Sequence, residues 1–199
     1  MITTVHKITK KPNNSQIVAG LLPTDSNIEF GGIKDTKEVF FVQNGKTHQF
    51  SDLPLKYVKQ LEEKYKSDVP AQKYLNGITN LFHKQLELYT YFLYGDIDTT
   101  PDILDGILQE PENFRDSDNC PSMLFKHKVI KIQDYILTPR EILITDLFKK
   151  DFTDKIIADS LNIAHSYLDY LKRNLFKNCG VTTKTAFVLK AQKYGVIQL

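Results

Sequence analysis

The stretch Leu137-Thr138-Pro139-Arg140-Glu141 decides the fold of the last third of the chain. Its threonine is a preferred N-cap residue, its proline suits the first helical turn, and its glutamate stands three residues after the threonine. In this arrangement each of the two side chains can accept a hydrogen bond from the backbone N–H of the other residue. The stretch therefore predicts that a helix begins at Thr138.

Three further helices are predicted downstream from capping residues and apolar spacing. Thr153 is the expected N-cap of a short helix over residues 154–161, and a tight turn then leads into a helix over residues 164–178. Gly180 can end that helix in a left-handed conformation, and Thr182 is the expected cap of a fourth helix. Two short helices joined in this way form a helix-turn-helix. The residues expected to face the core are Leu143, Ile144, Leu147, Phe148, Ile157, Ala158, Leu161, Leu168, Leu171, Leu175, Ala186, Phe187, Leu189, Ala191 and Tyr194.

Polar side chains recur every three or four residues along the third of these helices, so they project from one face. They are Ser166, Asp169, Tyr170, Arg173 and Lys177. Such a face on the second helix of a helix-turn-helix can enter the major groove of DNA. Asp169 is the unexpected member, because phosphate repels it. It can accept a hydrogen bond from a cytosine amino group, or it can pair with Arg173 four residues later, and we favour the pair.

Charge is divided unevenly along the chain. Residues 1–125 carry 13 Lys and Arg against 17 Asp and Glu, a net charge of −4, whereas residues 126–199 carry 13 against 7, a net charge of +6. A basic region attracts polyanions such as DNA. Solvated helix faces can carry the same charges, so charge alone leaves both interpretations open.

Residues 137–197 resemble the LuxR-type (GerE-like) DNA-binding domain from end to end. Residues 137–141 reproduce the opening motif of that family. Further matches are Lys155, Ile157, Ala158, Leu161, Ile163, Gly180, Val181, Gly195, Val196 and Ile197. The resemblance implies a mainly α protein with a C-terminal four-helix domain over residues 131–199. It also implies that the third helix lies in the major groove of duplex DNA and that the fourth commonly helps to form a homodimer.

Carried over to this chain, the resemblance assigns DNA contacts to particular residues. It implies that Asp169, Tyr170 and Arg173 face the bases, with Ser166 and Lys177 on the same stripe. Thr153, Lys155 and Lys184 fall where phosphate contacts are expected, which orient a protein on DNA without reading its sequence.

The chain also departs from the family pattern. The family commonly has Gly, Glu, Ser, Thr and a basic residue where this chain has Asp151, Ile156, Ala164, Tyr167 and Asp169. The loss of a serine cap at position 164 would cost about 1 kcal/mol unless Asn162 or Ser166 replaces it.

Residues 1–125 predict an α+β region of a different kind. Asn44-Gly45 between two apolar runs predicts a β-hairpin over residues 39–50, because both residues tolerate positive φ. Ser51 or Asp52 can then cap a helix that ends near Ser67. Residues 1–27 show no sustained periodicity, and residues 111–121 read as a polar connector.

Two more helices are predicted before that connector. One covers residues 70–94, and the other covers residues 98–109, with Thr100 as its cap and Pro101 at its first position. The apolar stripe of the longer helix is Tyr74, Leu75, Ile78, Leu81, Phe82, Leu86, Tyr89 and Leu93. Residues 88–94 are apolar nearly all round, which favours core packing over a self-association face.

The role of residues 1–125 stays open between dimerisation and signal input from an unknown ligand or protein. The order of one hairpin followed by helices does not fit a receiver domain, which needs alternating strands and helices. An autoinducer-binding domain normally carries Trp, which this chain lacks.

Other classes of function have weaker support. The helix-turn-helix could contact protein instead of DNA, which Tyr167 and Tyr170 beside Asp169 would favour. Asp96, Asp98, Asp102 and Asp105 could hold a metal ion, but acidic residues at a loop–helix junction are typically caps, so we expect no metal and no cofactor. No two histidines are spaced as metal ligands usually are. The sequence also lacks nucleophile motifs and glycine-rich phosphate loops, so we expect no catalysis.

The compartment expected is the cytoplasm. The longest dense apolar stretch is far shorter than the roughly 20 residues that span a bilayer. The first residues lack the apolar core of a secretion signal. The two cysteines, Cys120 and Cys179, are too few for a disulfide framework.

Overall fold

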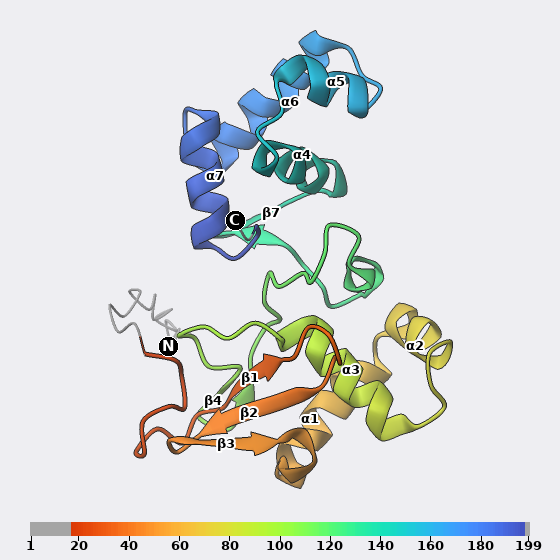
Figure 1. The fold of residues 1–199 in the computed structure, drawn as a ribbon, viewed down its shortest axis with the longest axis vertical. Helices are drawn as coiled ribbons and strands as arrows, with labels where there is room; N and C mark the ends of the chain where they lie inside the picture. The colour runs from red at the N-terminus through yellow and green to blue at the C-terminus, as the bar shows by residue number, and fades with distance from the viewer. Residues whose placement is uncertain (1–16, 198–199) are drawn as a thin grey trace, which may run out of the picture.

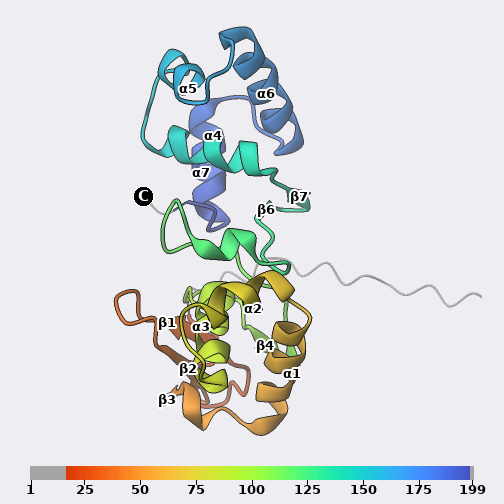
Figure 2. The ribbon, with the colours of Figure 1, turned by 90° about the vertical axis from the view of Figure 1, so that its right-hand side faces the viewer.

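The computed structural model describes residues 17–197, so residues 1–16 of the irregular start predicted for residues 1–27 lie outside it, as do residues 198 and 199. The described part is mainly α, with seven α-helices and three small antiparallel sheets. Its buried apolar residues form two clusters, one between Ile28 and Phe125 and one between Ile130 and Ile197. The two clusters lie at opposite ends of an elongated molecule (Figure 1, Figure 2).

The first cluster is built on a three-stranded meander of β1 (Glu29–Gly32), β2 (Val39–Gln43) and β3 (Lys46–Gln49). Asn44 and Gly45 turn the chain between β2 and β3 with φ of 52° and 74°. The predicted hairpin is therefore confirmed. Strand β1 was not predicted, because its four residues are bounded by no hairpin signal.

Three helices follow this sheet along the chain, after the 3-10 turn η1 (Phe50–Asp52): α1 (Leu55–Lys66), α2 (Val69–Asn76) and α3 (Phe82–Tyr94). The predicted end of the first helix near Ser67 is confirmed, since Ser67 is the C-cap of α1. The buried face of α3 packs against β1 and β2 (Figure 1).

The single long helix predicted over residues 70–94 is wrong, because the chain breaks between α2 and α3. Gln85 holds the break: its side-chain amide donates to Asn76 Oδ1 at 2.7 Å and to the Thr79 carbonyl at 2.6 Å. Three residues of the predicted apolar stripe are therefore exposed, namely Ile78, Leu81 and Phe82 at 52%, 58% and 42%.

The helix predicted over residues 98–109 is also wrong. This segment forms the hairpin of β4 (Ile103–Leu104) and β5 (Ile107–Leu108). Asp105 and Gly106 form its turn with φ of 52° and 83°, a conformation that Asp-Gly favours in two-residue hairpins. Thr100 caps no helix; its backbone N–H donates to Asp98 Oδ1.

The apolar segment 88–94 is buried, as the core interpretation predicted. Each of these residues in α3 is at most 6% exposed. Tyr89 stacks on Phe125 with ring centroids 5.9 Å apart, and Tyr91 meets Phe114 edge-on at 5.5 Å. These ring contacts hold the connector after β5 against α3. The apolar surface of α3 is therefore covered by residues of the same chain.

The second cluster follows the 3-10 turn η2 (Pro121–Leu124) and a small hairpin of β6 (Lys131–Ile132) and β7 (Tyr135–Ile136). Four helices then follow. They are α4 (Pro139–Lys149), α5 (Asp154–Ser160), α6 (His165–Asn178) and α7 (Lys184–Lys193). Each begins and ends within about two residues of the predicted bounds. The capping box is present, since Thr138 accepts from the Glu141 N–H and Glu141 accepts from the Thr138 N–H.

Details of the predicted core need correction. Leu143 and Leu189 are 51% and 59% exposed, whereas Ile142 is buried at 6%. The core of these helices is closed by residues that the pattern did identify, such as Phe148 and Phe187, whose ring centroids are 5.9 Å apart.

Thr183, not Thr182, is the N-cap of α7, and its hydroxyl accepts from the Ala186 N–H at 3.1 Å. Replacing Thr183 with Ala is therefore expected to lower the free energy of unfolding by about 1 kcal/mol. Thr182→Ala is the matched control and is expected to stay within about 0.5 kcal/mol of the parent. Urea denaturation followed by circular dichroism measures both; a larger loss in the control would contradict the assignment.

None of the helices between residues 17 and 197 combines the length and the hydrophobicity that a membrane-spanning segment requires.

Candidate nucleic-acid interface

The turn between α5 and α6 is set by one left-handed residue. Asn162 has φ of 51°, which Asn tolerates better than most residues. The Ile163 N–H then closes on the Ala158 carbonyl at 3.0 Å. Buried Ile157 and Leu168, one on each helix, fix the pair against the core. The outer face of α6 is consequently held at a defined angle to α5.

Helix α6 begins without a side-chain cap. Ala164 is its N-cap residue, and no side chain among residues 17–197 accepts from its first N–H groups. Neither Asn162 nor Ser166 replaces the missing serine, so the cost of about 1 kcal/mol expected for its loss applies. Exposed N–H groups at a helix start can instead contact phosphate, because they carry partial positive charge.

The predicted polar stripe does lie on one face of α6. Ser166, Tyr170, Arg173 and Lys177 are exposed, and Asp169 is half-buried. Within residues 17–197, no ion pair involves Arg173 or Lys177. Two cations on adjacent turns of the helix therefore face solvent without a partner.

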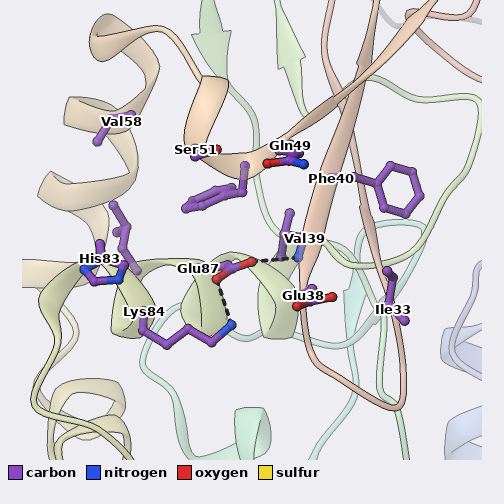
Figure 3. A pocket seen from close by; sticks show the side chains of 12 residues that line it. Ile33, Glu38, Val39, Phe40, Gln49, Ser51, Val58, His83, Lys84 and Glu87 are labelled. Carbon is purple, nitrogen blue, oxygen red and sulfur yellow. Dashed lines mark hydrogen bonds and ion pairs between the residues drawn. The ribbon is translucent and has the colours of Figure 1, made fainter.

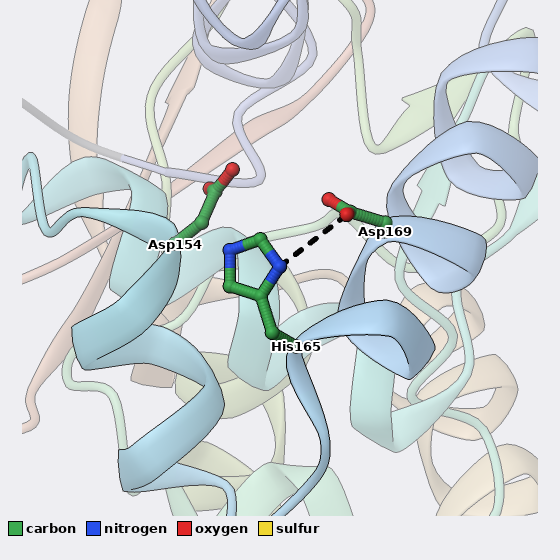
Figure 4. A group of neighbouring side chains, drawn as sticks. All are labelled: Asp154, His165 and Asp169. Atoms are coloured by element: carbon green, nitrogen blue, oxygen red, sulfur yellow. Dashed lines mark ion pairs between the residues drawn. The ribbon is translucent and has the colours of Figure 1, made fainter.

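The ion pair predicted between Asp169 and Arg173 is wrong. Asp169 lies 3.4 Å from His165 and 3.7 Å from the Lys172 ammonium. Lys172 also pairs with Asp154 at the start of α5. Figure 4 shows Asp154, His165 and Asp169 converging from the two helices, as a metal site would require. Because Lys172 already pairs with both carboxylates, this group is best explained as an ion-pair network that joins α5 to α6.

Tyr170, a predicted base contact, forms an aromatic pair at the start of α6 with Tyr167, which was not predicted to contact DNA. Tyr167 and Tyr170 are 41% and 53% exposed, and their rings stack with centroids 6.2 Å apart. Arg140 on α4 donates to the Tyr167 hydroxyl at 3.2 Å and lies over its ring. The spacing of the two tyrosines could have indicated the stack, but the contribution of Arg140 depends on how α4 crosses α6.

The three predicted phosphate contacts differ in availability. Lys155 is exposed near the start of α5. Thr153 uses its hydroxyl to accept from the Ile156 N–H, and its side chain is exposed. Lys184 is engaged within the protein, because its ammonium donates to Asp151 at 3.2 Å and to the Phe152 carbonyl at 2.9 Å. Of the two lysines, Lys155 is thus the one placed to meet a phosphate.

A groove of about 430 Å³ runs beside α6. Arg140 and Lys177 lie on it, together with Tyr167 and Asn174. Glu141 also lines the groove, so the formal charge of its lining is one positive unit, next to the exposed stripe. The surface that could meet a polyanion is therefore wider than α6 alone.

The N-terminal end of the molecule holds a larger cavity of about 730 Å³ (Figure 3). It lies between the sheet and helices α1 and α3, and Val39, Phe50 and Leu86 are among its apolar lining residues. Glu87 lies on one wall, where it accepts from the Val39 N–H at 3.1 Å and pairs with Lys84 at 2.9 Å. A cavity of this size and lining is typical of small-molecule sites.

These features define a helix-turn-helix with a partly basic outer face. No protein-family model matches the chain, and no solved structure gives a significant match. The chain is similar to the transcriptional regulatory protein ComA of Bacillus subtilis (strain 168), with 39% identity over 67 residues. The match covers 34% of this chain and 31% of ComA, so the chain spans about a third of the length of that relative.

Proposed function

We propose that this protein is a transcription regulator that binds duplex DNA by inserting α6 into the major groove. The observation that carries the proposal is the pair of exposed cations Arg173 and Lys177 on the outer face of the helix-turn-helix, which have no ion-pair partner in the part of the chain that the structure describes. The LuxR-type resemblance of residues 137–197 supports it, as does the similarity to a protein named as a transcriptional regulator. We propose that the protein acts in the cytoplasm and that its function needs no catalytic step.

The proposed roles follow from side-chain chemistry. Arg173 has the planar fork that pairs with the O6 and N7 atoms of guanine. Lys177 and Lys155 would contact phosphates and set the register of the protein on DNA. Because the Lys172 ammonium lies 3.7 Å from Asp169, that carboxylate repels the DNA backbone less than a free one would.

The exposed position of Leu189 supports a homodimer. This residue lies on α7 and is 59% exposed, although the sequence pattern placed it in the core. In the LuxR-type family the fourth helix commonly contributes to dimerisation. We propose that the outer face of α7 does so here, and that residues 1–125 add a second contact or a signal input through the cavity behind β2.

Replacing Arg173 and Lys177 together with Ala is expected to weaken DNA binding by full-length protein at least about ten-fold, because a base contact and a phosphate contact are lost. The log–log salt slope should become shallower by about 1. Fluorescence anisotropy of a labelled random-sequence duplex, titrated across a salt series, measures both. The control, Lys59→Ala with Lys73→Ala, removes the same charge from exposed positions of α1 and α2.

Equal losses in the two double variants would contradict the groove assignment and indicate non-specific attraction. Absence of binding at low salt would favour the alternative, a protein-interaction module. The stacked Tyr167 and Tyr170 would then be its natural contact surface, since exposed aromatic residues are enriched at interfaces.

A further inference from the structure

Three carboxylates from distant parts of the sequence meet inside the N-terminal region. Glu29 lies on β1, Asp102 directly precedes β4, and Glu112 lies in the connector after β5. One oxygen of each lies within 4.8 Å of an oxygen of the other two. Glu29 and Asp102 are 0% and 2% exposed. Only Asp102 belongs to the acidic group that the sequence had singled out.

Backbone N–H groups orient these carboxylates. Asp98 donates to Glu29 Oε1 at 2.7 Å, Phe30 donates to Asp102 Oδ2 at 2.8 Å, and Asp96 donates to Glu112 Oε2 at 3.2 Å. The second oxygens of the two glutamates, Glu29 Oε2 and Glu112 Oε1, are buried and have no hydrogen-bond partner among the described residues. A buried acceptor without a partner is unfavourable, so we expect these two oxygens to bind a ligand.

Burial and mutual repulsion disfavour the charged form of these carboxyl groups. Burial, with added repulsion from neighbouring carboxylates, raises the pKa of Glu29 to about 9 and that of Glu112 to about 8. Lys128 supplies one positive charge nearby, but burial lowers its pKa to about 8, and its ammonium donates to the Phe92 carbonyl at 2.9 Å. A cation that binds here would therefore take the place of protons that the buried carboxyl groups otherwise retain.

We propose that Glu29, Asp102 and Glu112 bind a divalent cation, and that the cation is calcium. Calcium is bound by carboxylate oxygens at 2.3–2.6 Å, so oxygens within 4.8 Å of one another can share one ion. Zinc is a poorer fit, because its sites are built mostly from Cys and His, and this cluster contains neither. Magnesium prefers to keep several waters, which a buried cluster disfavours.

The site would also stabilise the joint between the two ends of the molecule. Glu112 is followed directly by Asn113, whose side chain donates to the Tyr194 carbonyl at 2.6 Å. Arg115, two residues further, forms a buried ion pair with Asp146 on α4. An ion held by Glu112 therefore fixes the segment on which the helix-turn-helix is seated.

Calcium added to chelator-treated full-length protein is expected to bind with a stoichiometry of one in isothermal titration calorimetry. At a concentration 100 times the dissociation constant it should raise the thermal midpoint by about 5–10 °C. Glu29→Gln and Glu112→Gln should each abolish both responses. The matched control is Glu110→Gln, which removes an exposed carboxylate two residues from Glu112 and should leave both intact.

Because Gln removes a buried charge and keeps the shape, Glu29→Gln is expected to fold and to be more stable than the parent without calcium. Loss of the calcium response in that stable variant supports the site. No heat and no thermal shift in the parent protein overturns it, as does a response that survives in both cluster variants. Binding of magnesium in preference to calcium overturns the choice of ion.

Discussion

Replacing Asp146 with Ala is expected to lower the free energy of unfolding by about 3–5 kcal/mol, because it leaves the Arg115 guanidinium buried without its counter-ion. The two side chains are only 5% and 6% exposed. They form a two-pronged contact, with Arg115 Nη1 and Nη2 donating to the two Asp146 oxygens at 2.9 and 2.6 Å. Urea denaturation followed by circular dichroism at 222 nm measures the loss.

The same substitution should loosen the seating of the helix-turn-helix. Arg115 also donates to the Val196 carbonyl at 3.0 Å, so it joins the connector to both α4 and the end of the chain after α7. Limited proteolysis of the Asp146→Ala variant is expected to cut the connector near Arg115 faster than in the parent. A cut elsewhere would indicate general unfolding instead of local release.

Two controls separate the buried charge from the contact itself. Asp118→Ala removes an exposed ion pair with Lys150 that joins the same two regions, and it should change stability little, because water screens such pairs. The double variant Arg115→Met with Asp146→Leu should recover most of the loss, since apolar residues of similar volume often replace a buried pair without penalty. A loss below about 1 kcal/mol in Asp146→Ala would contradict the burial of the pair.

The C-terminal helices were predictable because their signals are local. A cap, a first-turn proline and a following glutamate lie within four residues, so Thr138 could be identified without knowledge of the fold. The buried side of α6 was predictable for the same reason, from the spacing of Leu168 and Leu175. The core positions predicted for Leu143 and Leu189 were wrong, because apolar spacing cannot distinguish a core face from a face left exposed.

The N-terminal errors have two different causes. The β4–β5 hairpin carries a local signal, Asp105-Gly106 between two Ile-Leu pairs, which was outweighed by the resemblance of Thr100-Pro101 to a helix start. The break before α3 has no comparable local signal. It depends on Gln85, whose amide bonds to Asn76 and Thr79 exist only once α3 folds back on α2.

Within the candidate site, the sequence indicated the stripe but not its partners. The spacing of Arg173 and Lys177 suffices to place them on one face of α6. The pairing of Lys172 with Asp154 could not be predicted, because it depends on the angle between α5 and α6.

The carboxylate cluster of Glu29, Asp102 and Glu112 could not be predicted either, because it depends on the packing of β1 beside β4. A bridge between Ile28 and Ile103 establishes this packing.

Replacing Asp68 with Ala is expected to destabilise the N-terminal region by at least about 3 kcal/mol, because several buried donors lose their acceptor at once. Asp68 is fully buried at the start of α2. Its Oδ1 accepts from the Ala71 and Lys126 N–H groups at 3.1 and 2.9 Å. Its Oδ2 accepts from the His127 N–H at 3.1 Å and from the Tyr89 hydroxyl at 3.2 Å. Differential scanning calorimetry and urea denaturation measure the loss.

Asp68→Asn separates the hydrogen bonds from the charge. The amide keeps one carbonyl oxygen for Ala71 and Lys126, but its NH₂ group faces the His127 N–H, which cannot accept a hydrogen bond. The Tyr89 hydroxyl can rotate and accept from that NH₂ group, so Asn should lose about half as much stability as Ala. Asp52→Ala, which removes an exposed acceptor of the Gln49 N–H, is the control and should have a small effect. Equal losses in Asp68→Asn and Asp68→Ala would mean that the charge of Asp68, not its number of acceptors, holds α2 to the segment after η2.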